Sequence, residues 1–105
     1  MPRIDRHACS TVQAHDAAAV MASGRLDLNP LGGAAGTVYA VEVDGHPVGA
    51  VVLTDAGWVA ARQGWQDHQP RTRRRAAVRR LLMSHPAGTF GVRPANLRPG
   101  GTPDD

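Results

Sequence analysis

The chain has 105 residues, of which 42% are hydrophobic and 20% charged, which is the length and composition of a single domain. Its one cysteine excludes an internal disulfide. The sequence contains neither an apolar run long enough to cross a membrane nor the pattern of a signal peptide. We therefore expect a cytoplasmic protein that makes no contact with a membrane.

The basic residues are unevenly distributed. All twelve are arginines and the net charge is +3, but residues 71–80 hold six of them and no acidic residue. The remaining 95 residues hold six arginines and nine acidic side chains, a net charge of −3. This asymmetry concerns the binding partner rather than the fold. The six clustered residues are Arg71, Arg73, Arg74, Arg75, Arg79 and Arg80.

The first predicted element is a helix. Residues 1–9 lack periodicity and are predicted to form a flexible arm. Ser10 and Gln13 have the spacing of a capping box, residues 11–23 are rich in alanine, and Gly24 can end a helix in the left-handed conformation. The breakers in residues 25–36 then predict a connecting loop.

Residues 37–63 are predicted to form a three-stranded antiparallel meander. Tyr39, Val41 and Val43 alternate with residues of the opposite face, and the pair Asp44-Gly45 is typical of a two-residue hairpin turn. The returning strand covers residues 46–53, and a third strand covers residues 58–63. This part of the chain therefore predicts a small antiparallel sheet.

Helical periodicity returns after residue 70. Val78, Leu81, Leu82 and His85 share one face, the arginines spread over the others, and Pro86 ends the pattern. We expect this helix to cover one face of the sheet. The predicted fold is thus α+β, with one α-β-β-β-α domain at residues 10–85 and a disordered tail at residues 86–105.

The arginine-rich helix is unfavourable for stability alone. Cations in a first turn oppose the helix dipole, and arginines four residues apart repel one another. Binding to a polyanion would convert these costs into affinity, because neutralising phosphates releases counterions. We therefore predict a non-catalytic protein that contacts the phosphates of DNA or RNA through residues 71–80. The alternative is a structural or regulatory protein that binds an acidic protein partner.

Two families share features with this chain. Residues 72–76, Thr-Arg-Arg-Arg-Ala, together with Leu81, Leu82 and the Tyr39-Ala40-Val41 segment, resemble the double-stranded-RNA-binding domain, whose second helix presents a basic cluster to phosphates. Residues 37–85 also resemble the arm-type DNA-binding domains of tyrosine recombinases. In that second family the sheet, rather than the helix, meets the groove of DNA.

Other candidate sites give weaker signals. Trp65 precedes the arginines and is a candidate for stacking on a base, the alternative being a lid over the core. His7, Cys9, His15 and Asp16 have no spacing typical of a zinc site. Because no motif identifies a nucleophile or a cofactor loop, we expect no catalytic residues, metal or cofactor.

Overall fold

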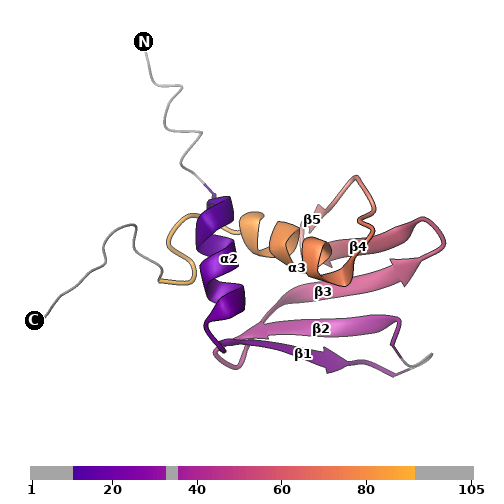
Figure 1. The fold of residues 1–105 in the computed structure, drawn as a ribbon, viewed down its shortest axis with the longest axis horizontal. Helices are drawn as coiled ribbons and strands as arrows, with labels where there is room; N and C mark the ends of the chain where they lie inside the picture. Colours follow the sequence, from indigo (N-terminus) through magenta and orange to yellow (C-terminus); the bar gives the residue numbers. More distant parts are fainter. Residues whose placement is uncertain (1–10, 33–35, 92–105) are drawn as a thin grey trace, which may run out of the picture.

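The computed structural model describes residues 11–32 and 36–91, which fold into two helices and one antiparallel sheet (Figure 1). The sheet has five strands in the order β1-β2-β3-β4-β5, so that each strand pairs with the next along the chain. The α+β class is therefore confirmed. The elements are α2 (Ala14–Ala22), β1 (Leu26–Pro30), β2 (Val38–Val43), β3 (His46–Thr54), β4 (Gly57–Arg62), β5 (Trp65–Gln66) and α3 (Arg74–Met83).

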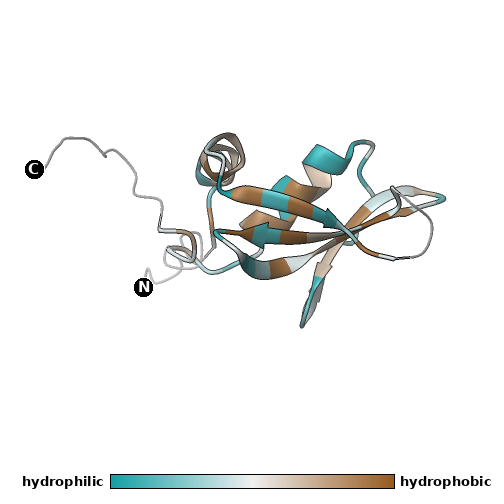
Figure 2. Cartoon of the chain, turned by 90° about the horizontal axis from the view of Figure 1, so that it is seen from below, coloured by the Kyte–Doolittle hydropathy of each residue, from teal (hydrophilic) through white to brown (hydrophobic). Residues whose placement is uncertain are grey.

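The sheet has one covered face. Both helices lie on the same side of it (Figure 2), and this inner face carries the buried side chains Val41, Val43, Val51 and Ala60. Because side chains alternate along a strand, the residues between them belong to the opposite, outer face. The predicted alternation of β2 is confirmed.

The meander has the predicted turn. Asp44 and Gly45 connect β2 to β3 with φ angles of 54° and 81°, the left-handed conformations that a two-residue hairpin favours. A β-bulge follows, where the register between β2 and β3 shifts at Val41 and Glu42.

Three strands were predicted, and the structure adds one at each edge. At one edge, β1 pairs with β2 where a connecting loop was expected. Its leucines, Leu26 and Leu28, alternate with the polar residues Asp27 and Asn29, as is typical of a strand with one covered face. At the other edge, β5 pairs with β4 in a segment that lies beyond the predicted meander. The proline and glycines that predicted a loop over residues 25–36 begin only at the last residue of β1, Pro30.

Both helices begin later than expected. The N-cap of α2 is Gln13, which makes no side-chain capping hydrogen bond. Thr11 instead forms a β-bridge with Pro86, and Ser10 lies outside the described residues. Gly24 has a φ of 86°, as predicted for the end of this helix. Arg71 and Arg73 precede α3, whereas the whole segment 71–80 was predicted to be helical.

The core lies between the helices and the inner face, and it includes a residue from the predicted tail. Leu81, Leu82 and Val78 of α3 are fully buried with Val20 of α2. Phe90 is 6% exposed, so this side chain anchors residues 86–91 to the domain where we expected the tail to begin. The expected arm, residues 1–9, and residues 92–105 lie outside the described residues.

Candidate functional site

The start of α3 lacks the usual features of a helix N-terminus. Its N-cap is Arg73, which has an extended backbone and forms no side-chain capping hydrogen bond, and the first turn contains no acidic residue. Arginines there add positive charge to the positive end of the helix dipole.

Arg71 is neutralised within the chain. Its Nε donates to Asp67 Oδ2 at 2.9 Å and its NH2 group donates to Asp67 Oδ1 at 3.2 Å. Asp67 is only 6% exposed. The hydrogen bond from Arg71 lowers the pKa of the Asp67 carboxyl below its usual value, although burial opposes this effect. The backbone N–H of Gln69 and the charges of Arg71 and Arg80 lower the pKa further. The Arg71 backbone also exchanges two hydrogen bonds with Trp58, which fixes the approach to α3.

Arg74 and Arg80 lie against other parts of the domain. The guanidinium carbon of Arg74 lies 4.5 Å from the centre of the Tyr39 ring and 5.9 Å from that of the Trp58 ring, within the range of cation–π attraction. The Arg74 side chain nevertheless remains exposed. Arg80 is half-buried, and its Nε has no hydrogen-bond partner among the described residues.

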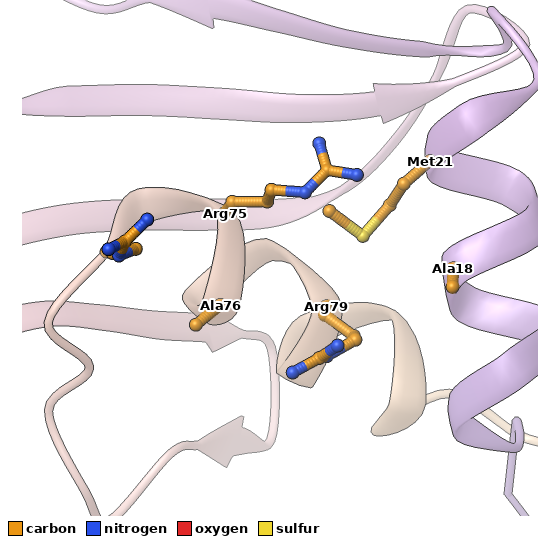
Figure 3. A pocket seen from close by; sticks show the side chains of 6 residues that line it. Ala18, Met21, Arg75, Ala76 and Arg79 are labelled. Carbon is orange, nitrogen blue, oxygen red and sulfur yellow. The ribbon is translucent and has the colours of Figure 1, made fainter.

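The other three arginines line one groove. The groove lies between α2 and α3 and encloses about 180 Å³. Figure 3 shows the side chains of Arg75 and Met21 reaching toward one another across the gap between the helices. We call this site the arginine groove, and its lining residues are Arg73, Arg75, Arg79, Ala18, Met21 and Ala76.

No described residue supplies the arginine groove with a counter-charge. Among the described residues, Arg73, Arg75 and Arg79 take part in no hydrogen bond or ion pair through their guanidinium groups, and all three are exposed. The helix opposite them contributes Ala18 and Met21 to the groove instead of an acidic side chain. The α2 carboxylate, Asp16, pairs with His15 at 3.1 Å.

The remaining candidates lie elsewhere. Trp65 is half-buried in β5 and packs against the core, and it does not line the arginine groove. Of the residues considered for a metal, His7 and Cys9 lie outside the described residues, and no group of ligands gathers within the described part of the chain. No described helix has the length and apolar character needed to span a bilayer.

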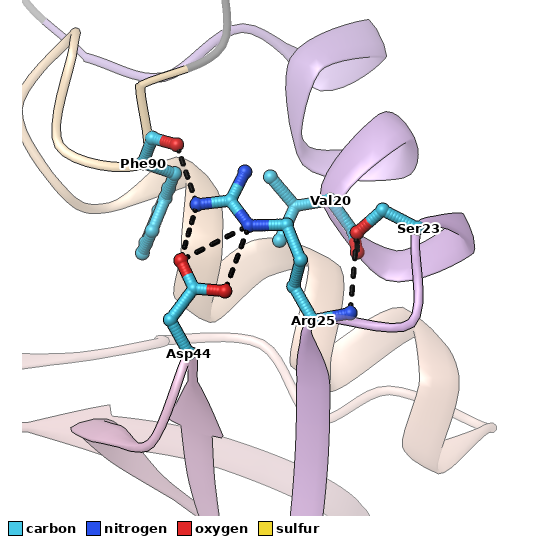
Figure 4. Close-up of polar contacts among 5 residues, drawn as sticks. All are labelled: Val20, Ser23, Arg25, Asp44 and Phe90. Carbon is cyan, nitrogen blue, oxygen red and sulfur yellow. Dashed lines mark hydrogen bonds and ion pairs between the residues drawn. The ribbon is translucent and has the colours of Figure 1, made fainter.

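A further polar cluster joins distant segments and was not visible in the sequence. Arg25 donates to both oxygens of Asp44 at distances between 2.6 and 3.1 Å, and its NH2 group also donates to the Phe90 carbonyl at 2.7 Å (Figure 4). This hydrogen bonding lowers the pKa of Asp44. The cluster ties the start of β1 to the hairpin turn and to residue 90, which is a structural role.

Comparison of the chain with known protein families, with characterised proteins and with solved structures gave no match. The functional argument therefore depends on the geometry and charge of the arginine groove.

Proposed function

We propose that this protein binds nucleic acid, without catalysing a reaction on it, through the arginine groove and the neighbouring Arg74. The observation that carries the proposal is that Arg73, Arg75 and Arg79 line one groove and that no carboxylate of the described residues neutralises them. Guanidinium groups match the geometry of phosphate and remain charged at all physiological pH values.

The energetics of α3 support an anionic ligand. Arg75 and Arg79 are four residues apart on the helix, so their like charges repel by a few tenths of a kcal/mol. The arginines of the first turn oppose the dipole by roughly 0.3–1 kcal/mol each when exposed. Phosphates at this end of the helix would reverse both effects, because they neutralise the side chains and complement the dipole.

The outer face of the sheet is a poorer candidate. Asp27 and Glu42 are paired across β1 and β2 on that face, and they would repel phosphates. The one arginine in the described strands, Arg62, is bound to Ser84 at the end of α3. Binding through the helices, as in the double-stranded-RNA-binding domain, therefore fits the charges better than binding through the sheet.

The test measures the affinity for labelled nucleic acid, both duplex and single-stranded, at several salt concentrations. We expect the affinity to fall steeply with salt, and Arg75→Gln and Arg79→Gln each to weaken binding and reduce the slope of log Kd against log salt by about one. The matched control is Asn29→Asp on the outer face, which changes the net charge by the same amount. It should leave the slope unchanged.

A second comparison separates site arginines from structural ones. Arg71→Gln removes the partner of buried Asp67, so we expect it to lower the unfolding midpoint and to leave the salt slope unchanged. Absence of binding to both nucleic acids at low salt would refute the proposal. An acidic protein would then be the remaining type of partner for these arginines.

A further inference from the structure

Half of the residues that line the arginine groove are apolar, which phosphates alone do not explain. Ala18, Met21 and Ala76 line the groove together with the three arginines. A phosphate oxygen placed against methyl groups and a thioether would lose water without gaining a hydrogen bond. The groove therefore fits a ligand that combines anionic groups for the arginines with an apolar group for Met21 and the two alanines.

The size of the groove limits what that apolar group can be. Its volume of about 180 Å³ is below the roughly 300–1,000 Å³ of clefts that hold drug-sized ligands. It suits one small ring system rather than a peptide helix or a base pair. Met21 is half-buried and polarisable, and a thioether makes favourable contacts with aromatic rings.

Arg74 offers a second surface for a planar ligand. Its guanidinium is held against Tyr39, while the side chain stays exposed to solvent. Nucleobases stack on guanidinium planes as well as on aromatic rings. Because the Tyr39 contact fixes the Arg74 side chain in advance, stacking there orders fewer bonds than it would on a free arginine.

We propose that the nucleic acid is single-stranded, with an unpaired base against Met21, its flanking phosphates on Arg73, Arg75 and Arg79, and stacking of a neighbouring base on Arg74. This inference rests on the proposed function and names its substrate class. In a duplex the faces of the bases are covered by their neighbours, and extruding one costs free energy. An unpaired strand offers its bases without that cost.

The experiment compares three labelled probes of equal length with the full chain, by fluorescence anisotropy. They are a twelve-nucleotide deoxythymidine strand, an abasic strand with the same phosphates, and a twelve-base-pair duplex. We expect the deoxythymidine strand to bind at least about tenfold more tightly than either of the others, since each stacked base adds substantially to affinity. An oligouridine strand that shows the same preference over the abasic strand equally supports the proposal.

Two variants locate the base contacts. Met21→Ala should reduce the preference for the deoxythymidine strand over the abasic strand and leave the affinity for the abasic strand unchanged. Arg74→Lys keeps the charge and removes the planar group, so it should also reduce this preference while leaving the salt slope unchanged. Circular dichroism checks the fold of Met21→Ala. If that variant does not fold, Arg74→Lys carries the test, because Arg74 is exposed.

The failures of the two proposals are distinguishable. Equal affinity for the abasic and deoxythymidine strands, or a duplex that binds as tightly as the single strand, overturns the single-strand proposal. In that case, sensitivity to Arg75→Gln still supports nucleic-acid binding. If none of the probes binds at low salt, both proposals fall.

Discussion

His85 links the end of α3 to the sheet through one ring nitrogen. Its Nε2 lies 2.9 Å from the carbonyl oxygen of Val48, which can only accept, so Nε2 carries the hydrogen. The ring also contacts Phe90 edge-on, with the ring centres 5.4 Å apart. Burial lowers the pKa of His85 below its ordinary value of 6.5, although the hydrogen bond to Val48 opposes this effect, and the charge of Arg62 lowers it further.

This lowered pKa predicts a pH-dependent stability. The folded state favours neutral His85, so its contribution is fully present above pH 6.5 and is lost as the pH falls from there through the lower pKa of the folded state. Glutamine can donate the same hydrogen bond and does not titrate. Between pH 7.5 and pH 5, we therefore expect the urea unfolding midpoint of His85→Gln to fall by less than that of the natural protein. Identical pH profiles for the variant and the natural protein would contradict this account.

At the residue scale, sequence reasoning found the arginines but not how they are arranged. The concentration of six arginines in ten positions is visible in the sequence. The pairing of Arg71 with Asp67 had a weak signal, the spacing of four residues, but the burial of Asp67 depends on β5, which was not predicted. The stacking of Arg74 on Tyr39 joins segments 35 residues apart, and no local pattern encodes it.

At the scale of elements, the close approach of α3 to the sheet depends on Gly49. This residue lies in β3 opposite Val41, with a φ of 150°. A Cβ added there would lie 2.6 Å from a methyl carbon of Leu81 and 2.7 Å from the carbonyl oxygen of Ala61. Leu81 occupies the space that a side chain at position 49 would need.

Gly49→Ala should therefore destabilise the protein. The clash involves backbone as well as a side chain, so we expect the free energy of unfolding to fall by about 2–3 kcal/mol, measured by urea denaturation. Gly32→Ala is the matched control, since nothing lies within 4 Å of the position that its new Cβ would take, and it should change stability by less than about 0.5 kcal/mol. Equal effects of the two substitutions would show that Leu81 and the Ala61 carbonyl can both move away from residue 49 without cost.

The elements were predictable where local chemistry determines them. The Asp44-Gly45 turn and the period of two specified the central hairpin and its faces. In contrast, β1 and β5 have five and two residues and depend on pairing with the strands beside them. The start of α2 was misplaced because Thr11 and Val12 pair with residues 85 and 86 instead of beginning the helix.

On the scale of the whole molecule, residues 86–91 complete the domain. Phe90 is buried against the core and its carbonyl oxygen accepts a hydrogen bond from Arg25. Residues rich in glycine and proline gave no sign of this packing, because it rests on one aromatic side chain and on a partner 65 residues away.

A truncation series tests this role. We expect a chain ending at His85 to be less stable than one ending at Gly91 by about 3 kcal/mol, the typical cost of losing a buried phenylalanine. Thermal or urea unfolding of the two chains gives the difference directly. Phe90→Ala in the longer chain should account for most of it. Equal midpoints for the two truncated chains would place residues 86–91 outside the cooperative unit.

The bridge between Thr11 and Pro86 joins the first described residue to a residue near the end of the described domain. The hydrogen bond from Val12 N–H to the His85 carbonyl, 3.0 Å long, holds the two ends of the described domain side by side. A domain whose two ends meet in this way can be inserted into a surface loop of another protein, because host and guest then share one point of attachment and neither chain is stretched.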